Sequence, residues 1–254
     1  MNAEEKQNLE NDEWISGNLK LNLFGAPIDI EMTVPAKPVK LRRMLPIFQS
    51  LTNFVVESSA SLAEEQGEKI SCAAGCGACC RQVVPITEAE IYQLQELVEN
   101  LPEPRRTEVR LRFARACERL HETKWLERMQ EFLQYTAGDR LELATEYFSE
   151  QIACPFLENE SCSIHPDRPL VCREYLVASP PENCSAPTAE TIAKLQIPVQ
   201  ISTKVAKMDF YSERTKTPFI PMIQALEWAE ARPETEVKKT GPEWMNQLFA
   251  LLGK

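Results

Sequence analysis

The stretch that decides the fold is Cys72-Ala-Ala-Gly-Cys76-Gly-Ala-Cys79-Cys80, in which only glycine and alanine separate four cysteines. Small residues let the backbone turn tightly and let amide N–H groups approach a thiolate sulfur. A loop that is merely buried would carry larger apolar side chains. The pattern is therefore typical of a loop that supplies metal ligands, and the rest of the chain must fold around it.

Two of these cysteines, Cys79 and Cys80, are adjacent. Neighbouring side chains of an extended segment point to opposite sides, so both could bind one ion only with unusual backbone geometry. The pair is compatible with two sites, with a bridged cluster, or with one ligand beside a supporting thiol. All three arrangements remain open at this point.

A second group of cysteines follows further along the chain. Cys154 and Cys162 flank a polar turn that could form a short hairpin, and prolines stiffen the segments around Cys172 and Cys184. Neither group alone accounts for its thiols, so we expect the fold to bring the two groups together. The predicted metal ligands are Cys72, Cys76, Cys79, Cys80, Cys154, Cys162, Cys172 and Cys184.

The ninth cysteine and the two histidines stand apart from this pattern. Cys117 has apolar neighbours at helical spacing, so we expect a buried core thiol. His165 follows Cys162 at a spacing compatible with a metal ligand, although a turn residue before Pro166 is the favoured interpretation. His121 lies in a charged segment and is not expected to bind metal.

Composition limits the class of protein. A chain of 254 residues with 43% hydrophobic content can bury a core without cysteine cross-links. The net charge of −10 argues against a nucleic-acid partner, which usually meets a basic face. The polar N-terminus lacks the apolar segment of a signal peptide, and no apolar run could span a membrane. We therefore expect a cytoplasmic protein, in which clustered thiols indicate metal more often than disulfides.

The remaining sequence predicts a mainly α fold with a small β component, in which helices surround an irregular cysteine-rich core. Residues 1–17 are expected to form an acidic flexible tail, and residues 18–66 a β-hairpin followed by a helix. Residues 67–254 are expected to form a cysteine-cluster metal-binding domain with a helical insertion at 87–151 and helices at its C-terminal end.

Hydrophobic periodicity and capping signals give the individual elements. The hairpin strands are expected at 19–24 and 28–34, and a further strand at 197–205. The helices are expected at 45–66, 87–100, 104–136, 139–151, 187–195, 218–231 and 241–252.

Two motifs resemble a known family. The first is the run from Cys72 to Cys80, and the second is Cys162-Ser-Ile-His-Pro-Asp-Arg168-Pro-Leu-Val-Cys172-Arg173-Glu-Tyr, preceded by a Cys-Pro-Phe-Leu at 154–157. Together they resemble the YkgJ-type cysteine-cluster proteins, which are described as a zinc- or iron-chelating domain. The resemblance implies a zinc or iron site without a settled biochemical role. The first motif has a gap of three residues where two is commoner, and His165 stands where tyrosine is usual.

Arg168 and Arg173 belong to the second motif and have two possible roles. An arginine beside thiolates can offset their negative charge, whereas an ordinary structural salt bridge would involve no metal. Both interpretations remain open for each residue.

Three functions are compatible with these motifs. The first is a zinc- or iron-chelating module. The second is an iron–sulfur protein with a 4Fe–4S cluster, for which four cysteines suffice; resemblance to flagellin lysine methylases, which carry a similar cluster, implies a redox or methyl-transfer enzyme. The third is a metal-delivery or protein-interaction module, which needs an exposed, exchangeable site. Whether the chain is an enzyme stays open, and no catalytic residue is assigned.

Overall fold

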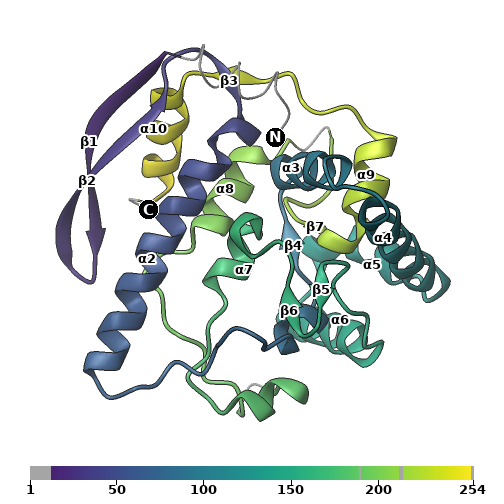
Figure 1. The fold of residues 1–254 in the computed structure, drawn as a ribbon. Helices are drawn as coiled ribbons and strands as arrows, with labels where there is room; N and C mark the ends of the chain where they lie inside the picture. The colour runs from purple at the N-terminus through teal and green to yellow at the C-terminus, as the bar shows by residue number, and fades with distance from the viewer. Residues whose placement is uncertain (1–12, 189, 212–213, 253–254) are drawn as a thin grey trace.

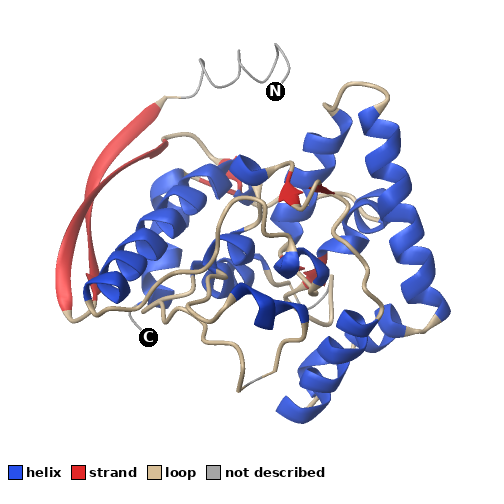
Figure 2. Cartoon of the chain, turned by 60° about the horizontal axis from the view of Figure 1, so that its bottom comes forward, coloured by secondary structure: helices blue, strands red, loops and turns tan. Residues whose placement is uncertain are grey.

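The computed structural model describes residues 13–188, 190–211 and 214–252. Helices dominate this part of the chain, and its strands pair into small two-stranded sheets, which confirms the expected mainly α fold with minor β (Figure 2). Among these residues, no helix combines the length and the apolar composition that a membrane span requires.

An antiparallel hairpin of β1 (Trp14–Leu23) and β2 (Ala26–Pro35) opens the described chain and confirms the predicted hairpin. Phe24 and Gly25 form its turn with φ values of 54° and 79°, the left-handed backbone that favours tight hairpin turns. β1 begins at Trp14, inside the segment that was expected to be a tail, whereas residues 1–12 lie outside the described residues.

The hairpin lies along one side of the first half of the molecule, next to α10 and α2 (Figure 1). This half has a core in which Phe48, Leu51 and Trp244 are almost completely buried, and β3 (Val39–Lys40) pairs with β8 (Lys238–Lys239) at its edge. Its helices are η1 (Leu41–Met44), α2 (Leu45–Glu65), α7 (Leu170–Glu174), α8 (Ile201–Asp209) and α10 (Gly241–Leu252).

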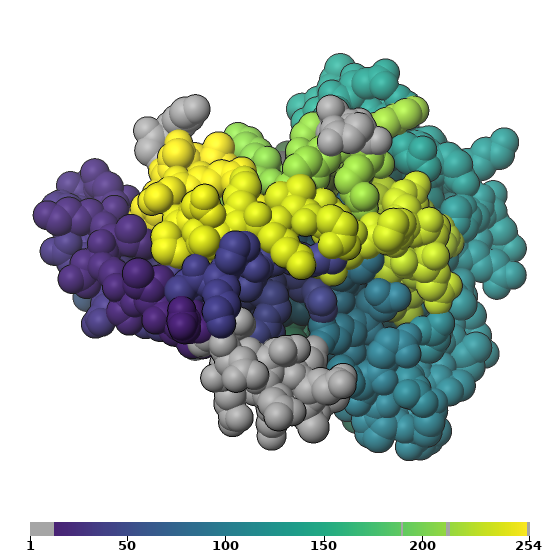
Figure 3. All heavy atoms as spheres, turned by 90° about the horizontal axis from the view of Figure 1, so that it is seen from above, coloured from purple at the N-terminus to yellow at the C-terminus, as the bar shows by residue number. Residues whose placement is uncertain are grey.

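The second half lies opposite the hairpin, where the teal segment of the chain covers one side of the molecule (Figure 3). Its core joins α3, α4 and α9 to the small sheet of β4 (Pro85–Ile86) and β7 (Ile220–Pro221). As predicted, Thr87 and Glu90 form a capping box at the start of α3. The helices of this half are α3 (Glu88–Glu99), α4 (Arg105–Glu122), α5 (Trp125–Met129), η3 (Phe132–Gln134), α6 (Ala137–Ser149), η6 (Met222–Gln224) and α9 (Ala225–Ala231).

The single helix predicted at 104–136 is wrong, because the chain breaks after α4. Lys124 has a left-handed φ of 56°, which turns the chain before α5. The turn buries Trp125 and Leu126, and the Trp125 indole N–H donates a hydrogen bond of 2.8 Å to the Leu143 carbonyl. Burial of these two large side chains therefore outweighs the continuous helix that local propensity favours.

Two further predictions near the C-terminal end are wrong. The segment 187–195 is not a regular helix in its described residues, and Lys194 instead forms an isolated β-bridge with Val177. The strand predicted at 197–205 is replaced by α8, which starts at Ile201. The Glu174 carboxylate accepts the Ser202 N–H at 2.9 Å and the Ser202 hydroxyl, so a residue distant in sequence caps the first turn of this helix.

Candidate metal centre

The first cysteine group lies on an irregular loop that follows α2 and ends in the short 3-10 helix η2 (Ala78–Arg81). Within the loop, the Cys76 N–H donates to the Ala73 carbonyl at 3.2 Å. Gly75 has a φ of 86°, a conformation that glycine adopts without the steric cost of a side chain. Cys76 and Cys79 are exposed, and Cys72 and Cys80 are half-buried.

Part of the second group lies on the hairpin of β5 (Leu157–Glu158) and β6 (Ser161–Cys162), which confirms the predicted hairpin between Cys154 and Cys162. Asn159 and Glu160 form its turn with φ values of 50° and 57°. Beneath it, Phe156 is fully buried and packs edge-on against Phe113, with ring centroids 5.5 Å apart. The hairpin is therefore anchored in the second core.

Hydrogen bonds join the two cysteine groups, as the sequence led us to expect. The Cys154 N–H donates to the Cys80 carbonyl at 2.7 Å. The Ser71 N–H donates to the Val177 carbonyl at 2.9 Å, and the Val177 N–H donates to the Cys72 sulfur at 3.4 Å. The last two predicted ligands follow from neighbouring elements: Cys172 from α7, and Cys184 from the 3-10 helix η5 (Pro181–Ser185), which packs on η2.

An ion pair and a close backbone approach hold the loop against the hairpin. Both terminal nitrogens of Arg81 donate to the Glu160 carboxylate, at 2.9 and 2.7 Å, and one of them also reaches the Gly77 carbonyl at 3.0 Å. A Cβ atom added to Gly77 would lie 2.7 Å from both Glu160 Oε2 and Leu157 Cδ1. Only a glycine therefore fits there without displacing the hairpin.

The two arginines of the second motif have different surroundings. Arg173 is 4% exposed and donates to the carbonyls of Arg168 and Pro166 and to the side chain of Asn53, so it braces the 3-10 helix η4 (His165–Asp167) against α2. In the described part of the chain, the buried Nε of Arg168 has no hydrogen-bond partner. The structural interpretation therefore fits Arg173, and Arg168 keeps a donor for another group.

The thiols lie close enough together to change one another's ionisation. Burial, together with the neighbouring Cys162 and Cys79, raises the pKa of the Cys154 thiol to about 12. Burial also raises the pKa of Cys72 and Cys162, which the charge of Arg168 partly opposes. Cys79 is a common neighbour, because it contributes to the raised pKa of Cys72, Cys154, Cys162, Cys172 and Cys184.

These residues fit a thiolate-bound metal in chemistry. Soft sulfur donors suit zinc, iron–sulfur clusters and copper(I), and a bound cation supplies the positive charge that gathered thiolates need. The unpaired Arg168 donor suits an anionic sulfur group. In the described residues, however, no three Cys, His, Asp or Glu side chains form a group arranged to hold a metal ion. The individual ligand assignments therefore stay predictions.

The ninth cysteine and the two histidines lie in three different environments. Cys117 is buried in the core around α4, and its thiol donates to the Ile223 carbonyl at 3.1 Å, which confirms its expected place. His121 is held between the carboxylates of Glu127 and Glu227. His165 is exposed, and the nearby charge of Arg168 lowers its pKa.

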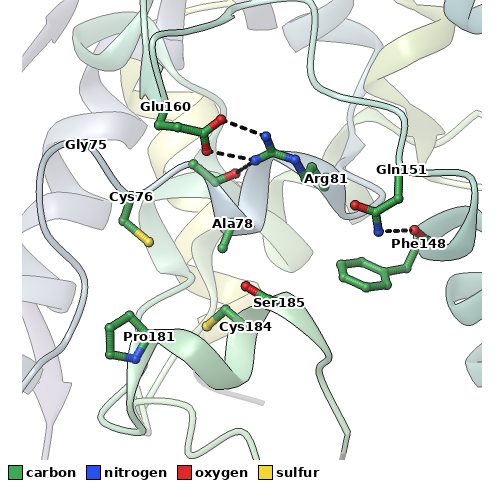
Figure 4. Close-up of a pocket in the computed structure, with 11 residues that line it drawn as sticks. Gly75, Cys76, Ala78, Arg81, Phe148, Gln151, Glu160, Pro181, Cys184 and Ser185 are labelled. Atoms are coloured by element: carbon green, nitrogen blue, oxygen red, sulfur yellow. Dashed lines mark hydrogen bonds and ion pairs between the residues drawn. The ribbon is translucent and has the colours of Figure 1, made fainter.

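A pocket of about 390 Å³ opens beside the cysteine loop (Figure 4). Cys76 and Cys184 line it together with residues that sequence reasoning missed, among them Arg81, Glu160 and Ser185. Arg81 follows Cys80 directly in the sequence, and this is a weak indication that Arg81 belongs to the site. Glu160 and Ser185 become neighbours of the loop only through the fold.

Comparison with known families assigns the segment that carries these features. Residues 71–193 match the family model described as "CxxCxxCC: Putative zinc- or iron-chelating domain". The segment is therefore similar to this family. The matched segment, called the CxxCxxCC domain below, contains all eight predicted ligands, from Cys72 to Cys184, and leaves out the N-terminal hairpin, α2 and the last three α-helices. Searches of curated proteins and of solved structures find no match to the chain.

Proposed function

We propose that the CxxCxxCC domain binds zinc or iron through cysteine thiolates from both of its cysteine groups. The observation that carries the proposal is the hydrogen bonding that joins the groups, from Cys154 N–H to the Cys80 carbonyl and from Val177 N–H to the Cys72 sulfur. These bonds bring segments distant in sequence to one place. A simple core would not require thiols on every one of these segments.

The chain's own residues prepare this site in two ways. Gly75 and Gly77 let the loop turn and approach the hairpin. Arg81 and Glu160 fix the loop against that hairpin. A bound metal would supply the charge that stabilises the thiolates, whose pKa burial otherwise raises.

An iron–sulfur cluster is a second candidate, and one observation favours it. The buried Nε of Arg168 lacks a partner among the described residues, while its charge lowers the pKa of Cys72, Cys79 and Cys162 against larger opposing effects. Hydrogen bonds to sulfur are one way in which proteins set the potential of such clusters. A cluster would support a redox or methyl-transfer activity, as the resemblance to flagellin lysine methylases implies.

Elemental analysis of protein purified without oxygen tests the proposal, with a UV–visible spectrum on the same sample. Colourless protein with bound zinc would support a chelating or structural site, and iron with acid-labile sulfide and brown absorbance would support a cluster. Cys76→Ser and Cys79→Ser should lose metal, whereas Cys117→Ala should retain it because its thiol bonds to Ile223 in the core. Full metal content in both loop variants would refute the ligand assignment.

A further inference from the structure

The pocket beside the cysteine loop has its walls on four separate parts of the chain, one of which is the β5–β6 turn with Glu160. The loop contributes Cys76, η5 contributes Cys184 and Ser185, and the chain at the end of α6 contributes Phe148 (Figure 4). Its volume of about 390 Å³ falls in the range of small-molecule sites, about 300–1,000 Å³. The pocket is therefore large enough for a small ligand beside two of the predicted metal ligands.

The walls favour recognition through sulfur. The charged lining residues, Arg81 and Glu160, pair with each other at 2.7 and 2.9 Å, so neither is left to bind a charged ligand. The other polar groups are neutral, such as the hydroxyl of Ser185. The soft donors of Cys76 and Cys184 are thus the distinctive chemistry of the pocket, and a metal bound there would prefer a further sulfur ligand.

Cys76 is held more loosely than the other predicted ligands. It is exposed and lies on a turn next to Gly75, whereas Cys184 is buried. Cys79 is also exposed, but its backbone lies within the 3-10 helix η2. The sulfur of Cys72 accepts a backbone N–H, and Cys154, Cys162 and Cys172 are half-buried. Cys76 is therefore the ligand best placed to leave a metal while the others stay in position.

We propose that this pocket admits a low-molecular-weight thiol that takes metal from the CxxCxxCC domain, with Cys76 as the ligand that it replaces; this rests on the proposed metal binding. The incoming thiol loses its proton as its sulfur bonds to the metal. The Cys76 sulfur takes up a proton as its own bond to the metal breaks. In this first exchange one metal–sulfur bond forms and one breaks. The metal leaves the domain as a complex with the small thiol once further thiol molecules have replaced the remaining cysteine ligands in the same way. No electrons are transferred, so the exchange needs neither oxidant nor reductant.

Zinc release from the full chain tests this exchange. The chain is loaded with zinc, a chromophoric chelator reports free zinc, and glutathione is added as the small thiol. Glutathione should speed zinc release several-fold, whereas S-methylglutathione, which has the same shape without a free thiol, should not. Equal rates with both compounds would overturn the proposal.

Two variants test the route. Ser185→Tyr fills the pocket and keeps every cysteine, so the ratio of the release rates with and without glutathione should fall to about one. Ser50→Tyr, on an exposed face of α2, is the matched control and should keep the acceleration. Undiminished acceleration in Ser185→Tyr would overturn the proposal.

The loading step separates this inference from the proposed function. A chain that binds no zinc or iron refutes metal binding itself and the exchange with it. A chain that loads zinc but ignores glutathione refutes only the exchange. Acceleration by a long cysteine-bearing peptide but not by glutathione would assign the pocket to a protein partner and overturn the choice of a small thiol.

Discussion

Replacing Gly77 by alanine should move the cysteine loop away from the β5–β6 hairpin. The added Cβ would meet Leu157 Cδ1 and Glu160 Oε2 at 2.7 Å and the Glu160 Cα at 3.2 Å. Ordinary carbon contacts lie at about 3.5–4.0 Å, so the hairpin or the loop must shift. Because Glu160 also holds Arg81, any shift disturbs the ion pair that positions the loop.

Two opposing contributions determine how much Gly77→Ala changes the free energy of unfolding. Inserting a methyl group into a filled space costs about 1–3 kcal/mol of unfolding free energy. Alanine has less backbone freedom than glycine in the unfolded chain, which raises the free energy of unfolding by about 0.4–1 kcal/mol. This gain applies because alanine can adopt the native φ of −93° at Gly77. The net loss should be about 1–2 kcal/mol, which lowers Tm by about 2–8 °C in a chain of this size.

Thermal unfolding and a zinc titration measure the two consequences for Gly77→Ala. Zinc affinity should fall about tenfold, the lower end of what residues that orient metal ligands contribute. Gly138→Ala is the matched control, because its Cβ would meet its nearest neighbour, Thr136 Oγ1, at an ordinary 3.6 Å. If Gly77→Ala matches Gly138→Ala in both stability and zinc affinity, the loop does not rest on the hairpin as described.

Two further predictions concern stability. Burial raises the pKa of Asp209 from 3.8 to about 7, although the hydrogen bond from the Ala89 N–H opposes this shift. The protonated Asp209 side chain therefore contributes fully to stability below pH 3.8, and this contribution is lost as the pH rises towards 7. Between pH 3.8 and 7, the unfolding free energy of Asp209→Asn should therefore fall less steeply with pH than that of the wild type, by up to about 1.4 kcal/mol per pH unit. Parallel pH profiles of the variant and the wild type would contradict this. Phe156→Ala should cost about 3–5 kcal/mol in urea unfolding, because the ring is fully buried against Phe113, whereas Leu141→Ala, at a site 63% exposed, should change stability by less than about 0.5 kcal/mol. Similar losses in the two variants would show that Phe156 does not anchor the cysteine hairpin.

The elements that sequence predicts well are those whose causes are local. Alternation of apolar residues and a Gly25 turn specify the N-terminal hairpin, and the Thr87–Glu90 capping box specifies the start of α3. The break at Lys124 has no such local signal, because burial of Trp125 decides it. Likewise, the β-branched residues after Ile197 favour a strand, and a helix forms instead because Glu174 caps it and Val205 is buried in the first core.

In the candidate metal site too, the sequence predicts the features with local causes and misses those that depend on distant contacts. Cysteine spacing identifies the eight predicted ligands and the need for the two groups to meet. It does not identify Glu160 as the partner of Arg81, because this contact joins residues far apart in the sequence through a hairpin turn with left-handed residues. Nor does it separate the two arginines of the second motif, whose roles depend on the carbonyls that Arg173 reaches and Arg168 does not.

The adjacent pair Cys79 and Cys80 shows how local geometry changes an inference from sequence. An extended segment would direct the two thiols to opposite sides, but both residues lie in the 3-10 helix η2. With three residues per turn, neighbouring side chains in such a helix are about 120° apart, and here the two thiols lie close enough for Cys80 to raise the pKa of Cys79. Thiols this close together cannot serve two distant metal sites. The geometry therefore favours a bridged cluster, or one ligand beside a supporting thiol, over two separate sites.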